Sequence, residues 1–168
     1  MTGEAGRATT VQLHLLRHAH AGDREDWSGP DDQRPLTAKG RAQSERLGTF
    51  LASVSFRPDL IVSSPMVRAA QTAEIVAERL GMEFQLDDRL GEELGIGQLE
   101  ALIADLGVAR PLLVGHDPDF TMLVVALCDA SGVEMKKGAL ARIDAARPLV
   151  AGAGQLRWLV PPDLLKGG

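Results

Sequence analysis

The sequence has very little that could cross-link the chain. It contains a single cysteine, Cys128, and no tyrosine, and with two tryptophans and four phenylalanines its aromatic content is only 4%. One cysteine cannot form an intramolecular disulfide, which excludes a small secreted domain held together by cystines. Cys128 follows the apolar run Leu123 to Leu127, so we expect it to be a small buried hydrophobic residue.

Long hydrophobic runs and an excess of positive charge are also absent. No stretch approaches the roughly 20 apolar residues that span a bilayer. Residues 1–10, which we expect to form a flexible N-terminus, are polar and lack the apolar segment of a signal peptide. The formal net charge of -5 disfavours broad nucleic-acid binding, which needs a basic surface. We therefore expect a cytoplasmic protein with no membrane or nucleic-acid partner.

What the sequence does contain is the composition of an ordinary globular protein. A chain of 168 residues can bury one sizeable hydrophobic core and is too short for two. Hydrophobic residues make up 45% and charged residues 24%, both close to the values of soluble globular proteins. We predict a single domain over residues 1–168.

Short apolar runs alternate with helical patterns along the chain. Strands are predicted at 11–16, 60–62, 83–86 and 111–114, with late strands at 139–143 and 155–160. Helices are predicted after Thr37, a good N-cap residue, after Pro65, which suits a first helical turn, over 96–106 before Gly107, and over 120–127. This alternation indicates an α/β three-layer sandwich with a mostly parallel central sheet flanked by helices.

Charged side chains follow three of the predicted strands where each strand ends. Arg17 and His18 come after the first, Arg68 comes shortly after the second, and His116 follows the strand at 111–114. Because ligands of parallel α/β sheets bind at the carboxyl ends of the strands, we expect these side chains to converge on one pocket. Guanidinium groups match phosphoryl oxygens and stay charged at any working pH. The pattern therefore predicts a phosphate-binding pocket.

Four motifs follow one another along residues 13 to about 123. They are Leu16-Arg17-His18-Ala19, Arg34-Pro35-Leu36-Thr37-x-x-Gly40, Ser63-Ser64-Pro65-x-x-Arg68-Ala69-x-Gln71-Thr72-Ala73, and Gly115-His116-Asp117-Pro118. In this order they resemble the histidine phosphatase superfamily, whose fold is that of phosphoglycerate mutase, and within it the small SixA-like phosphohistidine phosphatases. Ala19 departs from the usual Arg-His-Gly of the family but matches many of its small members.

The resemblance implies a role for each charged residue of the pocket. His18 would be the nucleophile that takes the phosphoryl group, Arg17 and Arg68 the phosphate clamp, and His116 a second histidine on the phosphoryl oxygens. A neutral imidazole nitrogen attacks phosphorus, and water then hydrolyses the phosphohistidine. Because the cationic side chains would stabilise the transferring group, no metal and no other cofactor is expected.

The proton donor to the leaving group is not decided by the sequence. Glu92 and Glu93 are the nearest candidates, since larger members of the superfamily supply an acid from a loop before the last motif. Both could instead be the solvated first turn of the following helix. His20 and Asp117 also lie beside the motifs and could handle protons. A zinc site built from His18, His20 and His116 is a further, disfavoured possibility.

The function implied by the resemblance is removal of phosphate from phosphohistidine in proteins. The alternatives are a small-molecule phosphomonoesterase and a non-catalytic module that recognises phosphorylated partners. The partner would be a phosphorylated protein or a small phosphate-bearing substrate, and the sequence says nothing of the oligomeric state. Residues 21–35 form a long polar loop that could act as a lid, with Trp27 either capping the pocket or anchoring the loop.

Overall fold

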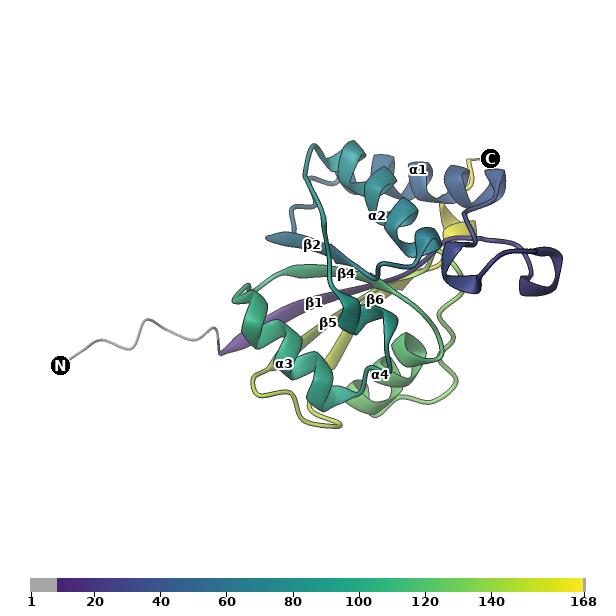
Figure 1. The fold of residues 1–168 in the computed structure, drawn as a ribbon. Helices are drawn as coiled ribbons and strands as arrows, with labels where there is room; N and C mark the ends of the chain where they lie inside the picture. The colour runs from purple at the N-terminus through teal and green to yellow at the C-terminus, as the bar shows by residue number, and fades with distance from the viewer. Residues whose placement is uncertain (1–8, 168) are drawn as a thin grey trace.

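The computed structural model describes residues 9–167 and contains one six-stranded mixed sheet between two pairs of helices (Figure 1). The strands lie in the order β3-β2-β4-β1-β5-β6. Their bounds are Thr10–Arg17 (β1), Leu60–Ser63 (β2), Gln85–Leu86 (β3), Pro111–Gly115 (β4), Leu140–Ala146 (β5) and Gln155–Val160 (β6). The helices are Ala38–Ser53 (α1), Val67–Leu80 (α2), Ile96–Leu106 (α3) and Asp119–Cys128 (α4).

Four neighbouring strands of the sheet, β3, β2, β4 and β1, run parallel to one another. β1 pairs with β4, β4 with β2 and β2 with β3, all in parallel, whereas β5 runs antiparallel to both β1 and β6. The carboxyl ends of β1, β2 and β4 therefore lie side by side at one edge. The predicted three-layer α/β sandwich with a mostly parallel sheet is confirmed.

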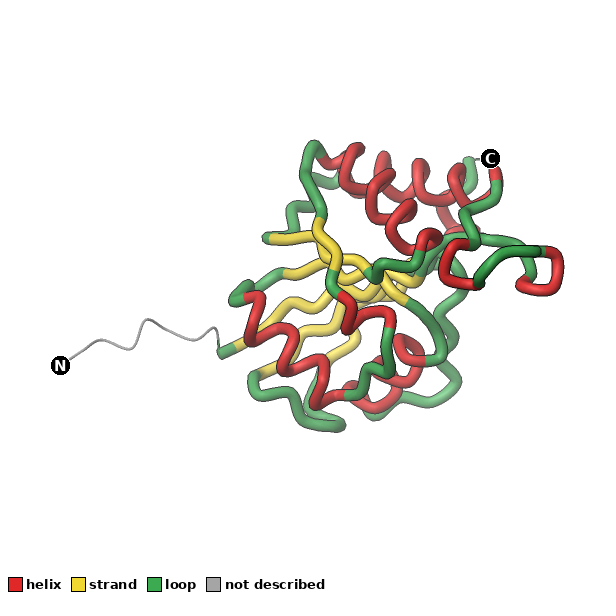
Figure 2. The backbone as a smooth tube through the Cα atoms, viewed as in Figure 1, coloured by secondary structure: helices red, strands yellow, loops and turns green. Residues whose placement is uncertain are grey.

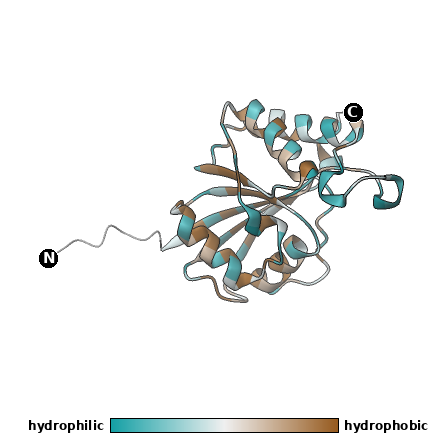
Figure 3. Cartoon of the chain, viewed as in Figure 1, coloured by the Kyte–Doolittle hydropathy of each residue, from teal (hydrophilic) through white to brown (hydrophobic). Residues whose placement is uncertain are grey.

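Each face of the sheet buries its own hydrophobic cluster. One cluster joins the sheet to α3 and α4 through residues such as Leu102 and Phe120, and the other joins it to α1 and α2 through residues such as Leu47 and Val76. All five residues of β4 are buried, which explains its uninterrupted apolar sequence. Figure 3 shows hydrophobic residues concentrated on the central strands, while the helices carry both kinds.

Most of the predicted elements are confirmed, with one correction at α2. Thr37 caps α1 by accepting a hydrogen bond of 3.2 Å from the Gly40 N–H. Pro65, by contrast, lies outside α2, which begins at Val67 with Met66 as its N-cap residue. Met66 has an extended backbone (φ -59°, ψ 135°), so the chain is still turning from β2 when it passes Pro65.

The ends of the chain bear on two further expectations. Residues 1–8, most of the segment expected to be a flexible N-terminus, lie outside the described residues. Thr10 already belongs to β1, and the Thr9 carbonyl accepts a hydrogen bond of 2.8 Å from Arg147. Cys128 is half-buried and packs against the cluster on the α3 and α4 face.

The polar loop of residues 21–35 projects beyond the sheet and contains two short 3-10 turns, Arg24–Asp26 and Asp31–Gln33 (Figure 2). Trp27 is 36% exposed, and its indole N–H donates to the Pro30 carbonyl at 2.9 Å. The ring lies over Gly29 of the same loop. Of the two interpretations of Trp27, the structure favours the anchor of the loop.

Gly40 allows α1 to approach the chain that follows β1. A Cβ atom at this position would lie only 2.0 Å from the His20 carbonyl oxygen, which is backbone and cannot rotate away. The same segment is held to α1 by hydrogen bonds from the His20 N–H to Gln43 and from the Thr37 N–H to the His20 carbonyl. The glycine of the second motif is therefore a packing requirement.

We expect Gly40→Ala to destabilise the protein by about 3 kcal/mol or more, because the added methyl forces α1 away from residues 19–21. Gly97→Ala is a matched control, since Gly97 also lies in a helix but a Cβ there meets no atom within 4 Å. The Gly97→Ala substitution should leave the free energy of unfolding unchanged or raise it by up to about 1 kcal/mol. Urea denaturation measures both, and equal effects would contradict the close-approach explanation.

Candidate active site

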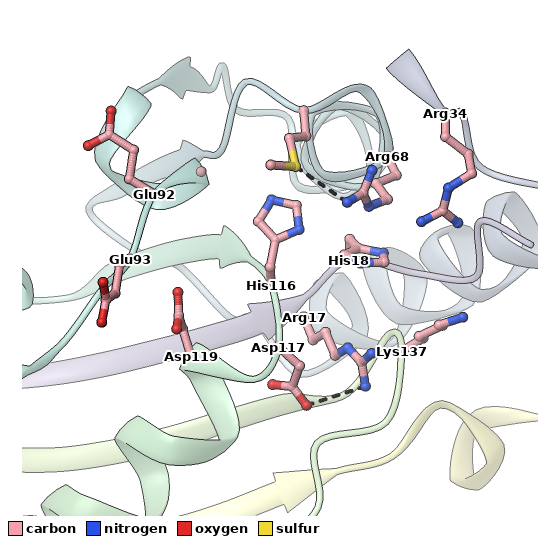
Figure 4. Close-up of a pocket in the computed structure, with 12 residues that line it drawn as sticks. Arg17, His18, Arg34, Arg68, Glu92, Glu93, His116, Asp117, Asp119 and Lys137 are labelled. Carbon is pink, nitrogen blue, oxygen red and sulfur yellow. Dashed lines mark hydrogen bonds and ion pairs between the residues drawn. The ribbon is translucent and has the colours of Figure 1, made fainter. Parts of the chain in front are cut away.

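The carboxyl ends of β1, β2 and β4 open onto a cavity of about 380 Å³. It contains the four residues predicted to bind and transfer phosphate, brought together from three separate parts of the chain (Figure 4). The side chains and backbone that line it belong to Arg17, His18, Arg34, Met66, Arg68, Gly91, Glu92, Glu93, His116, Asp117, Asp119 and Lys137. The convergence predicted from the strand ends is thus observed.

His18 lies directly after β1 and is held in a single orientation. Its backbone N–H donates to the Gly115 carbonyl at 2.9 Å, and the residue is only 5% exposed. Ring atom Nδ1 lies 2.8 Å from the Ala19 carbonyl oxygen. A carbonyl can only accept a hydrogen bond, so Nδ1 carries the proton and the lone pair is on Nε2. The buried imidazole thus has one nitrogen available as a nucleophile.

The surroundings of His18 keep it neutral. The pKa of this imidazole is lowered to about 3, mainly by burial and in part by His116, Arg68 and Arg17, against the opposing effect of the Ala19 hydrogen bond. The ring of His116 lies 5.2 Å away, measured between ring centroids, with an angle of 53° between the planes. A neutral His18 has the lone pair that nucleophilic attack requires.

His116 follows β4 and faces His18 across the cavity. Its Nε2 lies 2.7 Å from the Ser64 hydroxyl, whereas its Nδ1 is buried and has no partner among the described residues. Burial lowers the pKa of His116 to about 4, helped by the charges of Arg68 and Arg17. This histidine is therefore also neutral at pH 7, and no described group satisfies one of its ring nitrogens.

The guanidinium group of Arg17 is held in place by two contacts of its Nη1 atom. Nη1 donates to the Met135 carbonyl at 2.7 Å and lies 3.4 Å from an Asp117 carboxylate oxygen. Its Nε is buried without a partner in the part of the chain that the structure describes. An orphaned buried donor is rare in folded proteins, and beside this cavity it points to an anionic ligand.

Arg68, in the first turn of α2, repeats this arrangement. Nη1 donates to the Asp31 carbonyl at 2.7 Å and Nη2 to the Asp31 carboxylate at 3.1 Å, so the loop of residues 21–35 orients the guanidinium. Arg34 donates to the other carboxylate oxygen of Asp31 at 3.2 Å. The Nε of Arg68 is buried and unpartnered within residues 9–167, like that of Arg17.

Five cavity residues were given no role by the sequence analysis: Arg34, Met66, Gly91, Asp119 and Lys137. Arg34 stands in the second motif, so the motif was a usable signal for it. No sequence motif pointed to Lys137. It lies near the cavity because the N–H of the next residue, Gly138, donates to the Arg17 and His18 carbonyls. The cations Arg17 and Arg34 contribute to lowering the pKa of Lys137, after desolvation by burial.

The candidate acids occupy the opposite side of the cavity from Arg34 and Lys137 (Figure 4). Glu92 and Glu93 line the cavity and make no ion pair with any described residue. They lie before α3, which begins at Ile96, so their interpretation as the first turn of that helix is wrong. Asp119 joins them as the first residue of α4, and burial raises its pKa, with Glu93 and Asp117 adding to the effect.

The two other proton-handling candidates are engaged elsewhere. His20 does not line the cavity; its Nδ1 lies 2.7 Å from the Thr37 hydroxyl. Asp117 does line the cavity, but it accepts hydrogen bonds from the Thr121 N–H and hydroxyl at 3.0 and 2.7 Å while it contacts Arg17. Within the described residues, no group of three or more His, Cys, Asp or Glu side chains could hold a metal ion.

Comparison with protein families identifies the group of proteins that share this arrangement. The model of the histidine phosphatase superfamily (branch 1) matches residues 13–116, which include His18, Arg68 and His116. The chain belongs to the histidine phosphatase superfamily. Phosphatase chemistry is therefore the activity that this cavity supports.

Individual members of the superfamily are similar to this chain over different parts of its length. The phosphohistidine phosphatase SixA of Escherichia coli is 28% identical over 162 residues, covering 93% of this chain and 97% of that protein. A structure of the protein histidine phosphatase SixA complexed with tungstate superposes with a TM-score of 0.79 at 27% identity, covering 93% of this chain and all of that one. A probable phosphoglycerate mutase GpmB of Salmonella choleraesuis is 36% identical, but over 54% of this chain and 41% of its own. Among residues 9–167, no helix is long and apolar enough to cross a membrane.

The buried histidines of this superfamily member predict how its stability depends on pH. The pKa of His18 is about 3 in the folded protein, whereas an unfolded histidine titrates near 6.5, so between these values the unfolded state binds more protons. Stability should therefore be full above pH 6.5 and fall as the pH drops towards 4. His18→Gln should make this fall less steep by up to about 1.4 kcal/mol per pH unit. Urea denaturation from pH 4.5 to 7.5 measures it, and an unchanged slope would show that His18 is not buried neutral.

Proposed function

We propose that this protein is a metal-independent phosphohydrolase that removes phosphate from phosphohistidine in proteins through a covalent phosphohistidine on His18. The observation that carries the proposal is that the residues sharing the cavity with the free Nε2 of His18 contain three buried nitrogens with no partner in the described chain. They are Arg17 Nε, Arg68 Nε and His116 Nδ1. Such a set suits the oxygens of a phosphoryl group.

In the first step the lone pair of His18 Nε2 forms an N–P bond while the bond from phosphorus to the substrate nitrogen breaks. The leaving nitrogen keeps the electron pair and takes a proton. Arg17, Arg68 and His116 would bind the equatorial oxygens and stabilise their charge as they do so. Because Nδ1 of His18 donates to the Ala19 carbonyl, positive charge that develops on the phosphorylated ring has a fixed acceptor beside it.

In the second step a water oxygen forms a bond to phosphorus as the N–P bond breaks. The electron pair returns to Nε2, the water gives up a proton, and inorganic phosphate leaves. The acid that protonated the leaving nitrogen in the first step is now deprotonated, so it can accept the proton that the water releases. Glu92, Glu93 and Asp119 are the carboxyl groups of the cavity that remain for this proton transfer, since Asp117 accepts hydrogen bonds from Thr121.

The distribution of charge across the cavity favours a substrate with a basic leaving group. Cations surround the position of the phosphoryl group, and the three carboxyl groups lie on the other side of His116 (Figure 4). An imidazole leaving group is neutral or positive, so it suits this carboxyl side better than the carboxylate of a phosphoglycerate. The similarity to SixA proteins over nearly the whole chain supports the same substrate class.

A small phosphomonoester is the second candidate substrate, and the similarity to a probable phosphoglycerate mutase over 96 residues favours it. The experiment that separates the candidates is a turnover screen with a phosphohistidine protein, a phosphoramidate, 3-phosphoglycerate and an aryl phosphate, in the presence of a chelator. Our proposal requires the phosphohistidine protein to give the highest kcat/KM. A preference for 3-phosphoglycerate would establish the second candidate, and no turnover would leave a recognition module.

His18→Ala should abolish turnover while the fold is retained, because the imidazole is needed to form the covalent intermediate. The matched control is His20→Ala, since His20 lies two residues away but outside the cavity, and its activity should stay within a few-fold of wild type. Circular dichroism verifies folding, and trapping of an acid-labile phosphoenzyme reports the intermediate. Near-normal turnover by folded His18→Ala would refute the nucleophile assignment.

If Glu92 or Glu93 is the proton donor, its removal should affect substrates according to their leaving group. An alkoxide needs a proton in the transition state, whereas an imidazole departs more easily, especially when protonated. Glu92→Gln or Glu93→Gln should then slow an alkyl phosphate by about 10²–10⁴-fold and phosphohistidine far less. Glu83→Gln, at an exposed position outside the cavity, is the control. Equal losses on both substrates, or none, would exclude both glutamates and direct attention to Asp119.

A further inference from the structure

We propose that Ser64 is a positioning residue that sets the tautomer of His116, so that His116 presents an Nδ1–H donor to the phosphoryl group. The proposal rests on the proposed function in one respect, the phosphoryl group as ligand of the cavity. It concerns a residue that would not touch the substrate and acts through its hydrogen bond to His116.

Ser64 is fully buried at the end of β2, and its contacts are few. Its backbone N–H donates to the Val114 carbonyl at 2.9 Å, which ties it to the neighbouring strand β4. Its hydroxyl oxygen accepts a hydrogen bond of 3.2 Å from the Met66 N–H and lies 2.7 Å from Nε2 of His116. No other described group contacts this hydroxyl within hydrogen-bond distance.

Counting donors and acceptors decides the direction of the short hydrogen bond. If His116 carried its proton on Nε2, the Ser64 oxygen would accept twice, and its own hydroxyl proton would be buried with no described acceptor. If Ser64 instead donates to Nε2, every polar atom of its hydroxyl is satisfied. An unmade hydrogen bond at a buried group costs about 1–3 kcal/mol, so the second arrangement is the stable one.

This hydrogen bond determines whether Nδ1, the other ring nitrogen of His116, is protonated. With Nε2 accepting from Ser64, a neutral His116 must carry its proton on Nδ1, the buried atom that has no described partner. In Figure 4 a nitrogen of this ring points to the side of the cavity where His18 and Arg68 lie. An N–H there attracts a phosphoryl oxygen, whereas a lone pair in the same place would repel it. Because burial lowers the pKa of His116 to about 4, the ring does not simply become doubly protonated at pH 7.

Ser64 can impose this choice only if water does not offer its hydroxyl another acceptor. Gly91, in the 3-10 turn Asp88–Gly91, covers it: a Cβ on Gly91 would lie 3.2 Å from the Ser64 oxygen and 3.4 Å from Pro65. The absence of a side chain at Gly91 thus lets that turn seal the hydroxyl. The closure leaves the His116 ring as the acceptor that the Ser64 proton can reach.

The tautomer can be measured directly in the wild-type protein by ¹⁵N NMR with labelled histidine, without any substrate. At pH 7 we expect His116 to show a protonated Nδ1 and an unprotonated Nε2, and addition of vanadate or inorganic phosphate should shift the Nδ1 resonance. A protonated Nε2 with an unprotonated Nδ1 would overturn the proposal, even if no variant can be purified.

Ser64→Ala tests the cause, with Ser63→Ala as its control. Ser63 is equally buried and adjacent, but its hydroxyl donates to the Ser64 carbonyl and does not reach His116. Ser64→Ala should lose the preference for Nδ1–H and bind vanadate about 10- to 100-fold more weakly, as expected for loss of one hydrogen bond to a charged group. Ser63→Ala should keep both properties. Retention of the Nδ1–H tautomer and of vanadate affinity in folded Ser64→Ala would refute the proposal.

The failure of the proposed function would look different. A wild-type protein that binds vanadate at an Nδ1–H of His116 and yet hydrolyses no phosphoryl substrate would contradict the proposed function and leave the role of Ser64 intact. Conversely, an active enzyme whose His116 is protonated on Nε2 would contradict the role of Ser64 alone.

Discussion

The hydrogen bond of 2.8 Å between Nδ1 of His18 and the Ala19 carbonyl is the interaction on which the chemistry of this site depends. It assigns the proton to one nitrogen and leaves the lone pair on the other, facing the cavity. The bond is decisive because the ring is buried and neutral, so that water cannot exchange the two tautomers freely. The end of β1, anchored to Gly115 of β4, holds this geometry.

The cations around His18 are oriented by acceptors that lie far away in the sequence. Arg17 is held by Met135 and Asp117, and Arg68 is held by Asp31 in the loop that follows β1. Each guanidinium donates to the protein through terminal nitrogens, Nη1 in Arg17 and both Nη1 and Nη2 in Arg68, while its Nε has no partner within residues 9–167. The guanidinium groups are thereby held in place by the protein itself, which lowers the reorganisation that binding of an anion would require.

Sequence reasoning brought the four predicted site residues to one cavity, as the structure does, because that cavity is built from strand ends. The rule that ligands bind at the carboxyl ends of parallel strands needs only the strands and their order, and it predicts that Arg17, His18, Arg68 and His116 lie together. The acid was harder to locate. Glu92 and Glu93 do line the cavity, but Asp119 joins them only because α4 begins beside β4, and nothing in the local pattern distinguishes it from an ordinary acidic first turn.

The sequence by itself determined the α/β class, the motifs of the superfamily and the identity of the charged residues at the strand ends, because these depend on local periodicity and on residue types. Only the tertiary structure decided which nitrogen of each histidine is free, since that follows from acceptors such as the Ala19 carbonyl and the Ser64 hydroxyl. It also decided that His20 lies outside the cavity and that Lys137 lies within it. Most of these choices arise from contacts between residues far apart in the sequence, such as His116 and Ser64, which are 52 positions apart, and no local pattern contains them.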